Sequence, residues 1–311
     1  MPLKGVVKGK RRTPRIVLYG PPGIGKSTFG SDAEMPVFVP TEDGIDNLPV
    51  EQYPKAESWK QLLANVEEVA TEDHDRKTIV LDTGNGAVEL AAQDVCQTQF
   101  AGQWTAQKGS GGFLAWAQGW KSTSEEMRKL TIPLDKCRER GMTVLVLCHV
   151  GIQNVRHPSE GDYTKFAPDI EKSVWGRLSA WSDIILRADY EYVVIPDKGG
   201  TRGKAKGGSV RVMYATGTAA QEGKCRVGYE LPDEMPLSYA DFVTALGQNA
   251  DTLDEIKALW PLLSKPEATK ALAWLGVTRL EDATTTKSRQ LLERLRAKKV
   301  AQDASSATKE D

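Results

Sequence analysis

The feature that most constrains this chain is a glycine-rich segment that directly follows a short apolar run. Ile16 to Tyr19 has the composition of a buried strand, and residues 20–28 read GPPGIGKST, which contains the pattern G-x-x-x-x-G-K-S. Glycines at this spacing let consecutive backbone N–H groups turn toward phosphate oxygens, while the lysine reaches the β- and γ-phosphates and the serine hydroxyl binds Mg²⁺. The alternative is a glycine-rich turn with an exposed lysine.

The pattern therefore predicts a P-loop that holds a nucleoside triphosphate. The residues expected to line it are Gly20, Pro21, Pro22, Gly23, Ile24, Gly25, Lys26, Ser27 and Thr28.

A P-loop also needs a carboxylate near the metal, and Asp82 is the candidate. It closes the apolar run Thr78 to Leu81, where it can hold a Mg²⁺-bound water beside Ser27. The alternative is that Asp82 caps the turn that follows, which contains Gly84 and Gly86.

Two more strand ends carry polar residues suited to hydrolysis. Val37 to Val39 leads into an acidic pair, of which Glu42 is expected to be the general base and Asp43 is the rival. An ordinary acidic surface turn is the alternative there. The run Thr143 to Cys148 is followed by His149, which can contact the γ-phosphate or can be a hydrogen-bonded core histidine.

Short apolar runs alternate with helical stretches, which predicts an α/β fold with a mostly parallel central sheet over residues 16–245. Tyr190 to Ile195 and Val210 to Tyr214 flank a Gly-, Lys- and Arg-rich segment and predict a hairpin at the sheet edge. Residues 1–15 read as a basic arm. Helical spacing of leucines predicts a small helical appendage at 251–300, tethered by a flexible GQNAD segment, and 301–311 are expected to be disordered.

Composition excludes several classes of protein. The four cysteines form no C-x-x-C pair and the three histidines have no metal-ligand spacing, so structural zinc and a disulfide framework are not expected. No apolar run reaches the length of a membrane span and no secretory signal is recognisable, which predicts a cytosolic protein. The formal charge of −1 means that any affinity for nucleic acid must come from local patches.

The order of these segments resembles the RecA-like ATPase core, and in particular the compact phage-encoded RecA-like proteins that act as single-strand annealing proteins in recombination. The resemblance covers roughly residues 14–245 and departs at His149, where RecA has glutamine. The segments that carry it are GPPGIGKST (20–28), FVPTEDG (38–44), TIVLDTGNG (78–86), LCHV (147–150) and KCRVGYELPDEMP (224–236).

The resemblance implies that Lys26 and Ser27 bind ATP·Mg²⁺, Glu42 is the catalytic base, Asp82 is a metal carboxylate and His149 senses the γ-phosphate. Lys224 and Arg226 match the basic fingers that RecA-like subunits insert into a neighbour's site, which would make ATP turnover depend on a homo-oligomer, either filament or ring. The alternative is a pair of solvated charges at a strand end.

Single-stranded DNA is the expected partner because three segments combine aromatic or glycine residues with basic ones. The first two are expected to be loops, after the helix that follows the Asp82 strand and after the His149 strand, and the third is the basic hairpin. Aromatic rings stack on unpaired bases while Lys and Arg hold phosphates. Trp116 and Trp120, four residues apart, can instead be the buried face of a helix, and the basic hairpin can be a solvated loop. The residues expected to contact DNA are Lys108, Phe113 and Trp116, then Arg156, Lys165 and Phe166, then Arg202, Lys204 and Lys206.

Together these features predict an ATPase that binds single-stranded DNA and promotes strand annealing or pairing in phage recombination, in the cytoplasm of an infected bacterium. A single-strand-binding protein or another replication or recombination protein is a further expected partner. The rivals are a nucleotide-dependent replication adaptor that loads a helicase and a small-molecule kinase built on the same P-loop.

Overall fold

The computed structural model describes residues 12–105, 111–196, 203–226, 229, 231–278, 280, 291–292, 294–296 and 298–299. The strands are β1 (Arg15–Gly20), β2 (Pro36–Pro40), β3 (Glu51–Gln52), β4 (Thr78–Asp82), β5 (Thr143–Val155), β6 (Tyr163–Pro168), β7 (Ile184–Pro196), β8 (Gly203–Tyr214), β9 (Lys224–Cys225) and β10 (Glu234–Pro236). The helices are α1 (Lys26–Ser31), α2 (Trp59–Thr71), α3 (Gly84–Gln99), α4 (Gln118–Glu126), α5 (Arg128–Glu139), α6 (Lys172–Trp181), α7 (Tyr239–Leu259) and α8 (Lys265–Leu275), with the short 3₁₀ turns η1 (Ala115–Ala117) and η2 (Trp260–Leu262).

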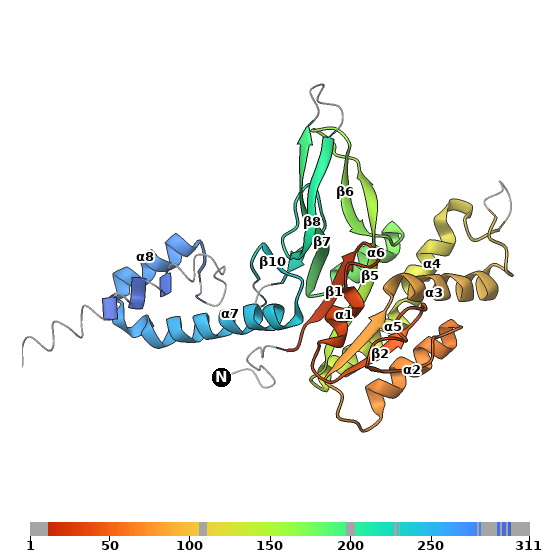
Figure 1. Ribbon diagram of the computed structural model, residues 1–311, viewed down its shortest axis with the longest axis horizontal. Helices are drawn as coiled ribbons and strands as arrows, with labels where there is room; N and C mark the ends of the chain where they lie inside the picture. Colours follow the sequence, from red (N-terminus) through yellow and green to blue (C-terminus); the bar gives the residue numbers. More distant parts are fainter. Residues whose placement is uncertain are drawn as a thin grey trace, which may run out of the picture.

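A mixed sheet forms the centre of the molecule (Figure 1), with the strand order β10-β8-β7-β1-β5-β4-β2-β3. The strands from β3 to the first part of β7 run parallel, whereas β8 and β10 are antiparallel additions at one side. The carboxyl ends of β1, β2, β4 and the parallel part of β5 therefore meet at one edge. This confirms the predicted α/β class with a mostly parallel central sheet.

The parallel strands are apolar on both faces because helices cover both faces, as is usual for parallel sheets. Val17 and Tyr19 pack into the core beneath α2, α3, α5 and α6. Ile16 and Leu18, which alternate with them along β1, pack on the opposite face with Phe29 of α1 and Phe242 of α7. The result is a three-layer sandwich with the P-loop at its carboxyl edge.

Two boundaries differ from the predictions. Arg15 is not part of an arm: it is the first residue of β1, and its guanidinium bonds the buried Asp183 at 2.9 Å. The GQNAD segment is not a flexible tether, because α7 runs through it without interruption. A single glycine costs a helix only about 1 kcal/mol, and Ser238 caps the start of α7 by accepting from the N–H of Asp241.

The segment after His149 also differs from the predicted loop. Strand β5 continues to Val155 and pairs antiparallel with β6, so a β-hairpin projects where a loop was expected. The predicted edge hairpin is present as β7 and β8, although β10 covers the outer side of β8.

The end of α7 packs with the C-terminal segment in a separate apolar cluster that includes Ile256, Leu275 and Leu295. This cluster is distinct from the two cores beside the sheet. Helix α8 begins with a capping box formed by Ser264 and Glu267 and ends at Gly276. Residues 1–11 and 301–311 lie outside the described residues. Within the described part of the chain, no helix combines the length and the apolarity that crossing a membrane requires.

Candidate nucleotide site and nucleic-acid interface

The P-loop connects β1 to α1 and encloses the Lys26 side chain. Gly25 has a φ of 110°, in the left-handed region that favours glycine. The Lys26 ammonium donates to the carbonyl oxygens of Gly20 and Pro21, at 2.9 and 3.0 Å. Burial lowers the pKa of Lys26 below its ordinary value, and the nearby Asp82 opposes that shift. The lysine therefore lies inside the loop, at the position from which it can reach phosphates.

Ser27 and Asp82 meet across this edge of the sheet. The Ser27 hydroxyl donates to Oδ2 of Asp82 at 2.7 Å. Burial raises the pKa of Asp82, while the Ser27 hydrogen bond and Lys26 act in the opposite direction. Asp82 does not cap the next helix, because the side chain of Thr83 caps α3 by accepting from the N–H of Gly86. A hydroxyl and a carboxylate at this spacing fit a Mg²⁺ ion, which prefers hard oxygen ligands.

Glu42 lies opposite the P-loop, held by two donors. Its Oε1 accepts from the Thr83 hydroxyl at 2.5 Å and its Oε2 lies 2.9 Å from Nε2 of His149. Burial raises the pKa of Glu42, but the bonds from Thr83 and His149 outweigh burial and leave the pKa below its ordinary value. Glu42 is therefore ionised at neutral pH.

The rival residue Asp43 points elsewhere. Its carboxylate is exposed and bonds Lys55 at 2.9 Å. His149 is not a satisfied core histidine either, since its Nδ1 is buried without a hydrogen-bond partner among the described residues. Asp43 also borders the nucleotide cavity, but its carboxylate bonds Lys55, whereas Glu42 is held by Thr83 and His149.

These side chains surround one cavity of about 340 Å³. It is lined by the P-loop, including Lys26, Ser27 and Thr28, and by Glu42, Asp43, Asp82, Thr83 and His149. Residues that are far apart in sequence meet here because parallel strands deliver their carboxyl ends to one edge.

Three residues of this site were not anticipated from the sequence, namely Thr41, Thr83 and Asn85. Thr41 exchanges hydrogen bonds with the backbone of Thr83, so the ends of β2 and β4 are tied together. Asn85 accepts from the N–H of His149 at 2.8 Å and donates to the carbonyl of Asp169 at 2.6 Å. The available signal was their place directly after the strand ends that carry Glu42 and Asp82.

Lys224 and Arg226 lie at the amino edge of the parallel strands, away from the P-loop. Lys224 and Cys225 pair with the start of β7. The Lys224 ammonium donates to the carbonyls of Ser179 and Ser182, and Arg226 bonds the carbonyl of Ala180 at 2.8 Å. Within one subunit both cations therefore cap the end of α6, which is the end that favours positive charge.

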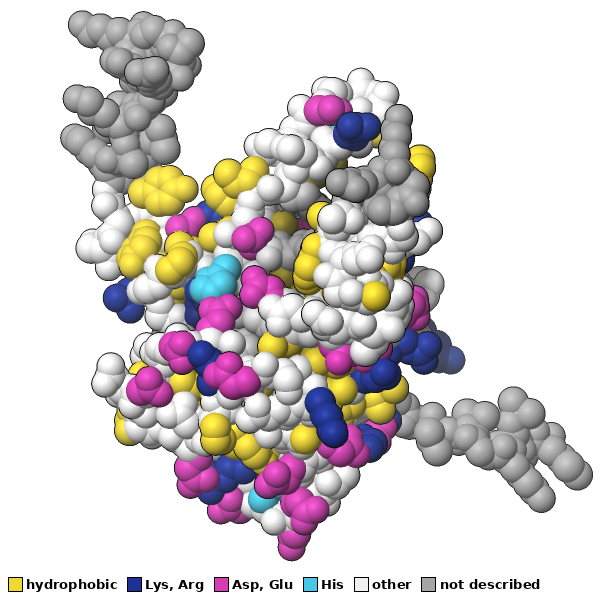
Figure 2. Space-filling model, turned by 90° about the vertical axis from the view of Figure 1, so that its right-hand side faces the viewer, with side chains coloured by type: hydrophobic (Ala, Val, Ile, Leu, Met, Phe, Trp, Pro, Cys, Tyr) yellow, Lys and Arg dark blue, Asp and Glu magenta, His cyan; other side chains and the backbone are white. Residues whose placement is uncertain are grey.

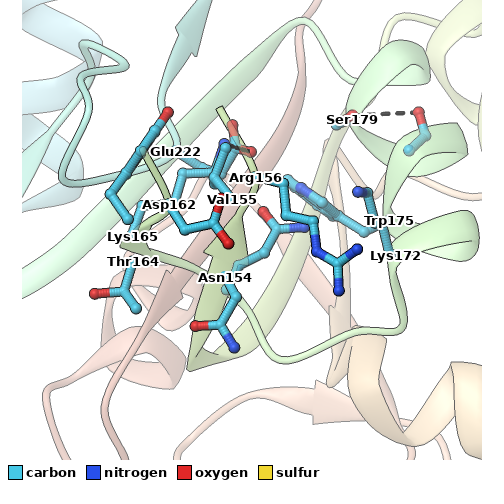
Figure 3. A pocket seen from close by; sticks show the side chains of 13 residues that line it. Asn154, Val155, Arg156, Asp162, Thr164, Lys165, Lys172, Trp175, Ser179 and Glu222 are labelled. Carbon is cyan, nitrogen blue, oxygen red and sulfur yellow. Dashed lines mark hydrogen bonds and ion pairs between the residues drawn. The ribbon is translucent and has the colours of Figure 1, made fainter. Parts of the chain in front are cut away.

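Of the residues expected to contact DNA after His149, Arg156 and Lys165 line a groove of about 730 Å³ between the β5–β6 hairpin and α6 (Figure 3), and Phe166 does not line it. Arg156 and Lys172 are exposed and come from the two walls of the groove, whereas Lys165 is paired with Glu222 at 2.7 Å. One face of the Phe166 ring is covered by the guanidinium of Arg187, 4.2 Å from its centroid.

The first segment expected to contact DNA contains one buried aromatic residue, Phe113, and one exposed aromatic residue, Trp116. The assignment of Phe113 to base stacking is wrong for this structure, because its side chain is fully buried against Phe100, Trp104 and Trp120. Trp116 is 83% exposed, so it does not belong to the buried face of a helix.

The other four residues expected to contact DNA are Lys108, Arg202, Lys204 and Lys206. Lys108 and Arg202 lie outside the described residues; Lys204 and Lys206 are in β8, and only their backbone is described. On the face drawn in Figure 2, acidic and basic side chains are interspersed and several hydrophobic side chains are exposed near its upper part. This agrees with the nearly neutral net charge.

Comparison with known proteins places the nucleotide site in a family. The chain is 26% identical over 181 residues to the SPbeta prophage-derived uncharacterized protein YorG of Bacillus subtilis (strain 168), an alignment that covers 55% of this chain and 49% of that protein. A crystal structure of the RadB recombinase aligns with a TM-score of 0.34 and 16% identity, covering 65% of this chain and 81% of that one. The AAA_24 family, described as an AAA domain, matches residues 12–227, which include every element of the nucleotide site. Since this match spans more than half of the chain, the protein belongs to the AAA_24 family.

Proposed function

We propose that this protein is an ATP-dependent single-stranded-DNA-binding protein that promotes strand annealing or pairing in phage homologous recombination. The observation that carries the proposal is the path of β5. This strand passes from His149, in the triphosphate cavity, to the hairpin that ends near Arg156 and walls the neighbouring groove. One rigid element thus links a phosphate-sensing position with a basic surface.

In the proposed reaction, Glu42 accepts the proton of the water that attacks the γ-phosphate. Thr83 and His149 hold its carboxylate in place through one hydrogen bond to each oxygen. Lys26 and the P-loop N–H groups hold the phosphates. Mg²⁺, when bound beside Ser27 and Asp82, neutralises phosphate charge.

The proposed coupling between ATP and DNA runs through His149 and Asn85. A γ-phosphate next to Glu42 competes for the donor on Nε2 of His149, because the same N–H cannot donate fully to both anions. Asn85 ties the His149 backbone to Asp169, which lies in the chain between β6 and α6, the two elements that flank the groove. A change at His149 is proposed to reach both walls of the groove by this route.

DNA contact is proposed to combine stacking and phosphate binding. Trp116 offers an exposed indole ring, and Arg156 and Lys172 offer cations that form no ion pair within the described residues. This combination suits unpaired bases without strong sequence preference. Lys165 and Phe166 are proposed to support the groove wall rather than to meet DNA directly, since both are already engaged with Glu222 and Arg187.

The active form is proposed to be a homo-oligomer, filament or ring, in which Lys224 and Arg226 leave the end of α6 and reach a neighbour's nucleotide. Arg226 is 45% exposed, and the buried Asp183 that it contacts at 3.2 Å keeps Arg15 and Arg138 as partners if Arg226 leaves. The setting is proposed to be the cytoplasm of a phage-infected bacterium, together with a single-strand-binding protein or another replication or recombination protein. The similarity to a prophage-derived protein supports this setting.

The test is to measure ATP hydrolysis by the full chain with and without single-stranded DNA, alongside annealing of complementary oligonucleotides. We expect DNA to stimulate hydrolysis and ATP to stimulate annealing. Turnover that is indifferent to DNA but requires a small phosphate acceptor would support the kinase. Nucleotide binding without any effect on annealing would support the replication adaptor.

A further inference from the structure

A basic side chain that the proposed reaction does not use lies against the P-loop. Arg211 belongs to β8, two strands away from β1, yet its Nη1 lies 3.1 Å from the position that a Cβ on Gly25 would occupy. The guanidinium therefore lies close against the backbone of Gly25, which also adopts a φ of 110° that favours glycine. Gly25 lines the nucleotide cavity together with Glu42 and His149, so the arginine lies against a residue of that cavity.

The local backbone directs Arg211 to this place. Tyr190 of β7 pairs with Arg211, but Tyr192 pairs with Gly207, so β8 carries extra residues immediately before Arg211. Such a bulge bends a strand and redirects the next side chain, and bulges are frequent beside active sites. Gly207 is required at the bulge, because a Cβ there would lie 2.6 Å from the carbonyl oxygen of Glu191.

The segment after β10 supports the position of Arg211 from the other side. The N–H of Leu237 donates to the carbonyl of Arg211 at 3.0 Å, and the Leu237 side chain would also meet a Cβ at Gly25, at 3.8 Å. The start of α7 then packs on α1 through Tyr239 and Phe29, whose ring centroids are 5.3 Å apart. Arg211 is thus held at the loop by backbone contacts.

The Arg211 charge has no partner within the part of the chain that the structure describes. The side chain is exposed, and no hydrogen bond or ion pair to a described residue engages its guanidinium. An arginine placed beside a phosphate-binding loop without a carboxylate is suited to an anionic ligand, because guanidinium binds phosphate oxygens through paired N–H donors.

We infer that Arg211 binds the phosphate chain of the nucleotide from within the same subunit. This role rests on the proposed ATP site but differs from that of Lys224 and Arg226, which are proposed to act on a neighbour. It also joins the nucleotide to the β7–β8 hairpin, since Arg211 stands at the base of the strand that carries Lys204 and Lys206. Figure 1 shows this hairpin extending away from the sheet.

The test compares ATP and inorganic triphosphate as ligands of the full chain and of the variants Arg211→Ala and Arg211→Lys. For Arg211→Ala we expect the Kd for both ligands to rise about ten-fold, equivalent to about 1.4 kcal/mol, and for Arg211→Lys the rise should be smaller. Arg128→Ala is the matched control, because Arg128 is an exposed arginine on α5, at the opposite face of the sheet. It should bind both ligands as the parent protein does.

The possible outcomes separate this inference from the proposed function. If the parent protein binds ATP and Arg211→Ala binds it equally well, Arg211 is no phosphate ligand and the inference fails alone. If ATP binding weakens but inorganic triphosphate does not, the contact is to the nucleoside and the phosphate assignment is overturned. If the parent protein itself binds no ATP, the proposed function fails. The midpoint temperature of thermal unfolding is measured for both Arg211 variants, and a value equal to that of the parent protein excludes a folding defect as the cause of weaker binding.

Discussion

The assignment of Glu42 as the general base predicts a variant that folds and binds ATP but does not turn it over. Glu42→Gln keeps the shape of the side chain and one acceptor oxygen, so one of the two hydrogen bonds from Thr83 and His149 can persist. The Glu42 side chain is 38% exposed, and a net hydrogen bond is worth about 1 kcal/mol. The free energy of unfolding should therefore fall by about 1 kcal/mol or less, which leaves the protein folded.

The rate should change far more than the stability, because an amide cannot accept the proton of the attacking water. General-base catalysis contributes about 10² to 10⁴ in rate. Phosphate release should be measured at saturating ATP with single-stranded DNA present, and ATP binding should be measured separately with a fluorescent analogue. Asp43→Asn is the control, since Asp43 is adjacent in sequence and borders the same cavity but bonds Lys55 instead of Thr83 and His149. Turnover by Glu42→Gln within about three-fold of the parent, or a large loss in Asp43→Asn instead, would refute the assignment.

Three further predictions concern other parts of the structure. Lys26→Ala should lose ATP binding in an equilibrium binding assay, because alanine has no cation for the phosphates. Its thermal unfolding should show an intact fold. Retained affinity for ATP would contradict the role of the lysine. Phe113→Ala should lower the free energy of unfolding by about 3–5 kcal/mol, because the variant loses a buried ring. Trp116→Ala should change the free energy of unfolding by no more than about 0.5 kcal/mol and weaken oligonucleotide binding about ten-fold, because this ring is exposed. The reverse pattern would remove Trp116 from the DNA surface. Burial raises the pKa of Asp183, but the hydrogen bonds and charge of Arg15 outweigh burial and hold that pKa below its ordinary range. The ionised Asp183 therefore stabilises the fold above a pH of about 4, and this contribution to the free energy of unfolding is lost as the pH falls through the folded-state pKa. In chemical denaturation at pH 7, Asp183→Asn should cost about 3 kcal/mol, and an equal loss at pH 7 and pH 3 would contradict this account.

The central sheet and its nucleotide edge were predictable from the sequence for a simple physical reason. Each parallel strand is a short run that is apolar on both faces, and each functional side chain stands directly after such a run. Ser27, Glu42, Asp82 and His149 could therefore be placed together without knowing how the strands are ordered. Side-chain partners then distinguish the two neighbouring acids, because Glu42 accepts from Thr83 whereas Asp43 bonds Lys55.

Features that depend on packing between distant segments were not predictable in the same way. Phe113 stands in a glycine-rich basic segment typical of a DNA loop, yet it fills an apolar site between α3 and α4. Arg211 reads as one of several cations in a basic hairpin, and only the bulge at Gly207 directs it to the P-loop. Likewise, polar residues after His149 suggested a loop, although their pairing with β6 satisfies the backbone as a hairpin.

The coupling of ATP and DNA is tested most directly by measuring each affinity in the presence of the other ligand. Binding of a labelled single-stranded oligonucleotide is titrated with no nucleotide and with a non-hydrolysable ATP analogue, and binding of the analogue is titrated with and without the oligonucleotide. We predict that each ligand tightens the other by the same factor, in the range of about 5- to 150-fold, because linkage is reciprocal. Failure to bind the oligonucleotide at low ionic strength, whichever nucleotide is supplied, would contradict the proposed function.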